Sequence, residues 1–366
     1  MNFFNKLFKK KENPIETYQD FWHWFQTKEK SFFKAVKKHT DVDRDALSPI
    51  MEKLQMLDEC FYCQIGMKDD NTADLVITVE GDIKSFVFVD ELIAAAPKID
   101  GWIFTNLKPA DGIGCSINMN GYKFDKETIS FYENVLPEYP DEIDITLVHK
   151  DLTEANKKAI TNGTFIFLET ILGEYNAATI IDSVDVKGLE ADNKTLIPIE
   201  KLKDFLIWRE KEFVEKYKGF RKSEEDGDSF TLFEAITEDD LPLIAVINQS
   251  LFEWYAQPSH PWLLVIKTEY DGEDNNGLPN SDSEVYEWMN QFEDEIIELL
   301  KPTEGYLNLG RETGMNTKKL YFACKEFKKA SKTTTELLKK YEGRLLMSYD
   351  IYKDKYWMTM NKFKQN

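Results

Sequence analysis

The succession of apolar patterns in the C-terminal part of the chain allows few folds. Residues 262–270 begin with five consecutive apolar residues, as in a buried strand, and apolar residues recur every three to four positions over residues 282–301, as in an amphipathic helix. The sequence continues with two strand patterns, a helix pattern and a last strand pattern, over residues 305–310, 318–324, 327–341 and 344–352. This β-α-β-β-α-β order predicts a ferredoxin-like domain, in which two helices pack on one face of a four-stranded antiparallel sheet.

The segment between the two middle strands, residues 311–317, contains a candidate binding residue. A phosphate-binding loop would lead from a strand into a helix and carry Gly-Lys-Ser or Gly-Lys-Thr, whereas this segment joins two strands. We therefore expect Gly314 to serve a hairpin turn. Arg311 is a candidate to bind an anion or to pair with the acidic residues 271–276 that follow the first strand.

The upstream part of the chain mixes helix and strand patterns in a less regular order. Helices are predicted at residues 16–38, 43–58, 83–96, 153–161, 198–217 and 240–254, with Asn162 and Gly163 as the stop of the helix at 153–161. Strands are predicted at residues 61–65, 73–79, 101–106, 143–149, 164–172, 179–186 and 230–235, with 164–172 and 179–186 as a pair. The fold class predicted is α+β, with an N-terminal α/β-rich mixed region at residues 1–218, a polar linker at 219–229 and the ferredoxin-like domain at 230–366.

Charge is unevenly distributed along the sequence. The chain has 46 basic and 66 acidic residues, a net charge of −20. Residues 1–40 carry nine lysines against four acids, residues 41–260 carry 21 basic against 44 acidic residues, and residues 261–366 carry 16 against 18. A field of this sign repels nucleic-acid phosphates, so we expect no general nucleic-acid binding and predict a basic protein as the partner.

A run of eight lysines between residues 318 and 340, which includes Lys325, is opposed by two glutamates only. The run has three interpretations. It is a solvated helix face, a contact surface for RNA or an acidic partner, or a surface that docks onto the acidic residues 41–260 of the same chain.

Cysteine and histidine positions do not predict a metal site. Cys60 and Cys63 have the spacing of a redox motif, but on a strand their thiols would face opposite sides, so we expect structural cysteines. The four histidines have no metal-binding spacing. The loop at residues 271–276 resembles a calcium loop in its acids, but its glycine comes one position late, at Gly277, which favours a solvated turn. No metal and no cofactor is therefore predicted.

The N-terminal sequence bears on the compartment. No stretch reaches the ~20 uninterrupted apolar residues of a membrane-spanning helix. Lysines follow the first apolar residues instead of preceding them, the reverse of a secretory signal, which predicts a cytoplasmic protein. An apolar face made of Phe3, Phe4, Leu7 and Phe8 could touch an anionic membrane; the alternative is a charged, frayed terminus.

Six short segments in the C-terminal part resemble, in the same order, the domain of unknown function 695 family. They are Pro261-Trp-Leu-Leu-Val-Ile-Lys267, Asn276-Gly-Leu-Pro279, Phe292-Glu-Asp294, Leu309-Gly-Arg-Glu-Thr313, Tyr321-Phe-Ala-Cys-Lys325 and Lys353-Asp-Lys-Tyr-Trp357. The resemblance covers residues 230 to the end, and the upstream region resembles the one found before this domain in bacterial proteins of the Bacteroidetes type. The family is similar to ferredoxin-like regulators of ribonuclease E, acidic proteins that act by binding an enzyme. The resemblance implies a fold and a non-catalytic precedent, and it supplies no catalytic residue.

These observations lead to two hypotheses on function. The first is a non-catalytic protein-binding or regulatory module, for example an inhibitor of a basic enzyme or toxin. The second is a metal-assisted hydrolase with a site between the domains, built from the acids of residues 271–276 and Arg311. No catalytic residue is assigned, and the candidate binding residues are Arg311, Asp271, Asp274, Lys325 and Trp357.

Overall fold

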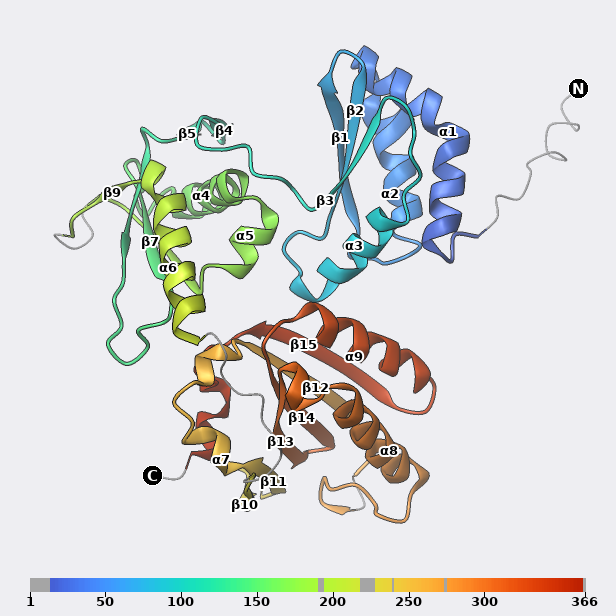
Figure 1. The fold of residues 1–366 in the computed structure, drawn as a ribbon, viewed down its shortest axis with the longest axis vertical. Helices are drawn as coiled ribbons and strands as arrows, with labels where there is room; N and C mark the ends of the chain where they lie inside the picture. Colours follow the sequence, from blue (N-terminus) through green and yellow to red (C-terminus); the bar gives the residue numbers. More distant parts are fainter. Residues whose placement is uncertain (1–13, 190–193, 218–227, 239, 273–274, 365–366) are drawn as a thin grey trace, which may run out of the picture. The chain divides into compact units, whose positions relative to one another are not determined.

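The computed structural model describes residues 14–189, 194–217, 228–238, 240–272 and 275–364. It divides into two compact units, residues 1–109 and residues 110–366, and combines helices with several separate sheets (Figure 1). The predicted α+β class is thus confirmed. Most of the predicted linker at 219–229 and the apolar face at the N-terminus lie outside the described residues, so the predicted domain boundaries stay a prediction.

The first unit packs the long, aromatic-rich helix α1 and two shorter helices against a small sheet. Its sheet has the order β1-β2-β3, antiparallel between β1 and β2 and parallel between β2 and β3. The bounds are Tyr62–Asp69 for β1, Thr72–Thr78 for β2 and Trp102–Asn106 for β3. The helices are α1 (Tyr18–Lys38), a π-helical turn (Asp43–Leu47), α2 (Ser48–Leu54), a 3₁₀ turn (Ile83–Ser85) and α3 (Phe86–Ala94).

Helix α1 forms where the sequence predicts it, because an N-terminal capping box and an aromatic stripe at helical spacing both occur in this segment. Thr17 accepts a hydrogen bond from the Asp20 backbone N–H, and the Asp20 side chain accepts one from the Thr17 backbone N–H, which closes a capping box. Phe25 is buried on the stripe and meets Trp102 of β3 edge-to-face, with ring centroids 5.0 Å apart.

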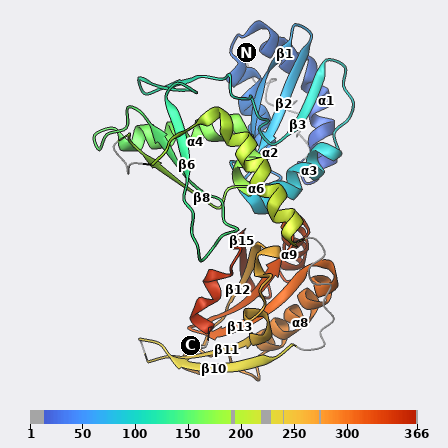
Figure 2. The same cartoon turned by 60° about the vertical axis from the view of Figure 1, so that its left-hand side comes forward.

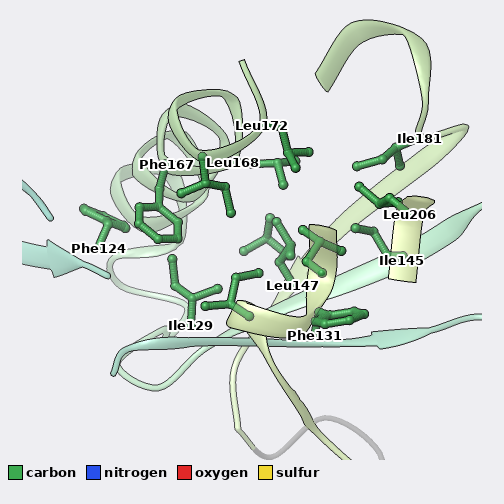
Figure 3. Close-up of a cluster of buried hydrophobic side chains, with 14 of the residues drawn as sticks. Phe124, Ile129, Phe131, Ile145, Leu147, Phe167, Leu168, Leu172, Ile181 and Leu206 are labelled. Carbon is green, nitrogen blue, oxygen red and sulfur yellow. The ribbon is translucent and has the colours of Figure 1, made fainter. Parts of the chain in front are cut away.

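The second unit begins with a hairpin and a four-stranded sheet of order β8-β7-β6-β9. The strands are β4 (Ile117–Met119), β5 (Tyr122–Phe124), β6 (Ile129–Glu133), β7 (Asp144–His149), β8 (Ser183–Lys187) and β9 (Ile197–Pro198). The helices are α4 (Lys157–Leu172), α5 (Glu174–Thr179), a 3₁₀ turn (Ile199–Lys201) and α6 (Leu202–Tyr217). Figure 3 shows the core, where Phe167 and Leu168 of α4 point toward Ile129 and Leu147 of the sheet.

Two predictions in this region are wrong. Residues 153–161 do not form a helix that stops at Gly163, and residues 164–172 are not a strand, because α4 runs unbroken from Lys157 to Leu172. Gly163 is there for close packing: a Cβ atom on it would lie 2.1 Å from Cζ of Phe124. The predicted strand at 179–186 begins at Ser183 instead, and it pairs in parallel with β7.

The C-terminal part has the predicted β-α-β-β-α-β order, here β12-α8-β13-β14-α9-β15. The strands are β12 (Trp262–Glu269), β13 (Tyr306–Gly314), β14 (Thr317–Cys324) and β15 (Leu346–Lys353), and the helices are α8 (Glu284–Leu299) and α9 (Lys328–Lys340). These strands lie in the order β13-β14-β12-β15, and each neighbouring pair is antiparallel.

The sheet is larger than predicted, because β10 (Phe230–Ile236) and β11 (Pro242–Asn248) extend it to six strands, in the order β10-β11-β13-β14-β12-β15. The helix predicted at 240–254 is therefore wrong: residues 242–248 form β11, and only one short turn, α7 (Gln249–Phe252), follows. Leu243, Ile244 and Val246 form a short apolar run whose periodicity fits either type of element, and pairing with β13 makes it a strand.

Both faces of this sheet are covered over its centre. Figures 1 and 2 show α8 and α9 on one face, while α7 lies on the other in Figure 1. The second face packs against the C-terminal 3₁₀ turn, Met358–Phe363, through a buried cluster. Its fully buried members include Leu263, Tyr321, Ala323, Trp357 and Met360.

The hairpin between β13 and β14 is tighter than predicted. Residues 311–314 belong to β13, and the turn consists of Met315 and Asn316, both left-handed, with φ of 53° and 59°. Gly314 ends the strand rather than forming the turn. Arg311 therefore stands on a strand, where its side-chain direction is fixed by the alternation of the sheet.

Candidate functional site

A groove of about 590 Å³ lies beside α8, over the strands at the β10 end of the six-stranded sheet. We call it the α8 groove. Strands β10 and β11 contribute apolar side chains, and the loop before α8 adds Leu278 and Pro279. Polar and charged side chains come from α8 (Tyr286, Asn290, Glu293 and Asp294) and from β13 and β14 (Arg311, Thr313 and Lys318).

The groove is open because the sheet extends beyond its helices. On β10 the groove side carries Leu232, and residues two positions away share its face. Phe230, Leu232 and Ile236 are 51%, 58% and 75% exposed. The opposite face of the same strand is packed, since Phe233 meets Phe363 with ring centroids 6.1 Å apart. Large apolar side chains are thus exposed on one side of an edge strand.

A buried ion-pair cluster forms the polar wall of the groove. The Glu293 carboxylate accepts hydrogen bonds from Arg311 Nη1 at 2.6 Å and from Lys318 Nζ at 2.6 Å. Lys318 also donates to Asn290 Oδ1 at 3.2 Å. Glu293 and Lys318 are buried, whereas Arg311 is half exposed. The cluster therefore fixes α8 against β13 and β14 and leaves the outer part of one guanidinium in the groove.

The segments that border the groove carry acids and no bases. Residues 228–248 contain five acidic residues, residues 271–298 contain ten, and neither segment contains Lys or Arg. Arg311 and Lys318, the two cations of the groove, both contact Glu293. The surroundings of the groove are thus strongly negative, although residues 261–366 as a whole are close to neutral.

The structure separates the five candidate binding residues. Arg311 lines the α8 groove, and Asp271 is exposed at the start of the loop that borders it. Asp274 lies outside the described residues. Lys325 is exposed at the end of β14, in a different cavity. Trp357 is 0% exposed and donates its indole N–H to the His260 carbonyl at 3.0 Å, so it is placed in the core.

Glu293 and Lys318 are the site residues that sequence reasoning missed. Glu293 belongs to a run of three acids that fits a solvated helix face. A signal for its burial was present: Met289, Phe292 and Ile296 form an apolar stripe at helical spacing, and Glu293 stands on it. A lone acid on an apolar stripe needs a buried cation as its partner, which Lys318 supplies.

The cavity that contains Lys325 has a volume of about 260 Å³ and a second set of buried charges. Lys353 Nζ lies 3.0 Å from Asp182 Oδ1 and donates to the Ile180 carbonyl at 2.7 Å. Lys355 Nζ donates to Asp182 Oδ2 at 2.7 Å and to the Asp141 carbonyl at 2.6 Å. Burial lowers the pKa of Lys353 to about 8 even though the nearby Asp182 carboxylate opposes the shift. These lysines connect the end of β15 to the loops beside β7 and β8.

The lysine run at 318–340 is engaged largely within its own part of the chain. Lys340 of α9 pairs with Glu295 of α8 at 2.6 Å, and Lys329 pairs with Glu304. Lys319 lies 3.9 Å from Glu312, and Lys332 lies 3.8 Å from Glu336. Together with the pair formed by Lys318, these contacts go to acids of residues 293–336 and not to acids of residues 41–260.

In the part of the chain that the structure describes, no group of three or more His, Cys, Asp or Glu side chains is placed to hold a metal ion. All four cysteines are free. Burial raises the pKa of the Cys63 thiol to about 12, which suits a structural side chain of β1.

The fold and the groove describe an α+β protein whose C-terminal sheet leaves one edge uncovered beside an acidic helix. Residues 233–363, which contain all the lining residues of the α8 groove except Leu232, match the model of a family of unknown function, DUF695, which confirms the resemblance noted for the C-terminal part of the sequence. No curated protein and no solved structure matches the chain. None of the described helices is both long and apolar enough to cross a membrane.

Proposed function

We propose that this chain is a non-catalytic protein-binding module whose α8 groove and β10 edge hold an extended, basic segment of a partner protein. The observation that carries the proposal is the exposed apolar face of β10 between two segments that contain acids and no bases. Exposed apolar area of this kind on a polar-rimmed surface is typical of interaction sites. A partner with alternating apolar and basic residues matches both properties.

The position of β10 supplies the binding mode. It is the last strand of the sheet, so the backbone groups on its outer side have no neighbouring strand within the sheet. A segment of the partner that adds as a further strand would satisfy these groups by backbone hydrogen bonds. Alternate side chains of that strand would lie beside Phe230, Leu232 and Ile236 on the groove face of β10. Its basic side chains would approach Glu234, the acid on the same face of β10.

Charge favours a different protein over a second copy of the chain. Pairing of two β10 edges would bring together two segments that each carry five acids and no base. Like charges at that separation repel, and Arg311 and Lys318 already contact Glu293. A basic partner removes this repulsion, and long-range attraction would speed its association.

The partner class proposed is a basic enzyme or toxin that the module regulates. The similarity to ferredoxin-like regulators that act by binding an enzyme supports this class, and a cytoplasmic location is part of the proposal. The metal-assisted hydrolase stays a prediction. It rests on the acids of residues 271–276 and on Arg311, which the structure pairs with Glu293.

A labelled peptide of alternating lysine and valine tests the proposal by fluorescence anisotropy. Leu232→Lys places a cation in the groove, and we expect it to lower the affinity for the lysine–valine peptide by a factor of about ten or more. Leu346→Lys is the matched control, because Leu346 is 68% exposed and lies on β15, the opposite edge strand of the same sheet. Equal loss of affinity in both variants would contradict the proposal, as would equal binding of a glutamate–valine peptide by the unmodified protein.

A further inference from the structure

A larger cavity, of about 810 Å³, lies in the first unit between α1 and α2. We call it the α1–α2 groove. Its volume is in the range of small-molecule sites. None of its lining residues belongs to the protein-binding site proposed above, so an inference drawn from it stands independently.

The floor of the α1–α2 groove is aromatic. Trp24 and Phe32, two turns apart on α1, have ring centroids 5.6 Å apart. Phe32 is buried, and the Trp24 ring is partly accessible. The Trp24 indole N–H is buried and has no hydrogen-bond partner among the described residues. The accessible part of the Trp24 ring suits a planar ligand, although its buried N–H cannot reach one; Lys53, which also lines the groove, has its Nζ 6.0 Å from the centroid of this ring.

The rim of the groove is basic in a protein of net charge −20. Lys28, Lys34 and Lys38 line it from α1, and all three are exposed. Within the described part of the chain none of the three forms an ion pair with a carboxylate, in contrast to Lys329 and Lys340 of α9. Arg44, also at the rim, is bound to Asp41 and Asp45. Glu52 and Lys53 of α2 also line the groove, which therefore carries five basic and two acidic side chains around its aromatic floor.

We infer that the α1–α2 groove binds a small phosphorylated ligand with a planar ring, of the nucleoside monophosphate class. The ring would stack on Trp24, and the phosphate would lie among the ammonium groups of the rim. A long nucleic acid does not fit the charge of this unit, since residues 1–109 carry 15 basic against 18 acidic residues. A short anion meets only the local positive field.

Isothermal titration of the full-length protein with adenosine monophosphate, adenosine and inorganic phosphate tests this inference. We expect adenosine monophosphate to bind, and adenosine and inorganic phosphate each to bind more weakly by a factor of about ten or more. Lys34→Glu should weaken nucleotide binding about tenfold, since it reverses one charge of the rim. Lys30→Glu is the matched control, because Lys30 is an exposed lysine of the same helix that does not line the groove.

Three outcomes would overturn the inference. They are no binding of adenosine monophosphate, binding of inorganic phosphate as tight as that of the nucleotide, and an equal effect of Lys30→Glu and Lys34→Glu. Thermal unfolding of each variant shows that the fold is retained, which is expected because both lysines are exposed. The peptide affinity of the α8 groove should not change in either variant, so a failure here and a failure of the proposed function are distinguishable.

Discussion

The six-stranded sheet has two edge strands, β10 and β15, which differ in how other parts of the chain pack against them. Helix α9 packs against β15, and Tyr352 of β15 bonds to Thr359 of the C-terminal 3₁₀ turn at 3.0 Å. The end of β15 is held by Lys353 and Lys355, both bound to Asp182. On β10 the apolar side chains of one face stay exposed, beside acids that have few basic neighbours. Strand β15, although it too is a last strand of the sheet, is packed by α9 and held at its end by ion pairs, whereas the exposed apolar face of β10 is available for a partner.

The largest loss of stability is expected beside β15, when the carboxylate of Asp182 is removed. Asp182→Ala leaves Lys353 and Lys355 without their shared carboxylate and removes the acceptor of the Ile143 backbone N–H, which lies 2.7 Å away. The free energy of unfolding should fall by about 5 kcal/mol, the upper end for a broken buried ion pair. Urea denaturation measures it, with the exposed Asp185→Ala as the control. Equal losses in Asp182→Ala and Asp185→Ala would show that the ion pairs of Asp182 with Lys353 and Lys355 do not stabilise the fold.

A smaller loss of stability is expected in the α8 groove, when the carboxylate of Glu293 is removed. Glu293→Ala leaves Lys318 buried without a carboxylate, while the half-exposed Arg311 can turn to water. The expected loss is about 3 kcal/mol in the same urea experiment. Asp294→Ala changes the neighbouring exposed acid and should cost less than about 0.5 kcal/mol. Equal losses would contradict the buried ion-pair cluster.

The next prediction concerns Lys353 of β15, which should make the stability of the protein depend on pH in the alkaline range. The pKa of Lys353 is about 8 in the folded chain, below that of an unfolded lysine, so between these values the unfolded state binds more protons. Stability should therefore rise with pH from about 8 toward 10, by up to about 1.4 kcal/mol per pH unit. Lys353→Met should flatten this rise, whereas Lys267→Met, a change on the exposed part of β12, should leave it in place. A rise unchanged by Lys353→Met would show that another group causes it.

The smallest effect is expected where α9 and α8 pair at the surface. Lys340 and Glu295 are both partly exposed, so solvent screens their interaction. Lys340→Ala should lower the free energy of unfolding by less than about 1 kcal/mol. A loss above 3 kcal/mol would mean that the lysine run stabilises the domain and is more than a solvated helix face.

How far the sequence predicted the fold depended on whether local patterns decide it. The β-α-β-β-α-β order was predictable because α8 carries a long apolar stripe, α9 has Ala330, Thr334 and Leu337 on one face at helical spacing, and short apolar strand patterns separate them. Strand β11 was missed because a short apolar run fits either element, and only pairing with β13 decides. Helix α4 was split because Gly163 looks like a stop, although Phe124, distant in sequence, is the reason for it.

The candidate site was predicted less well than the fold. Arg311 was identified as a charged residue near an acidic loop, and it does line the α8 groove. The groove itself depends on how far the sheet extends beyond α8, a property of strand order that no local pattern contains. The ten-acid segment was hidden by counting residues 261–366 together, because the lysines of α9 offset the acids of α8 in that count, while the five-acid segment fell in the separate count for residues 41–260.

Hydrogen–deuterium exchange with the lysine–valine peptide is the most direct test of the central claim that β10 is the binding edge. We expect the peptide to slow exchange of the backbone amides of β10 and of the loop before α8, and to leave exchange at β15 unchanged. Slowed exchange at β15 or along α9, with β10 unaffected, would contradict it.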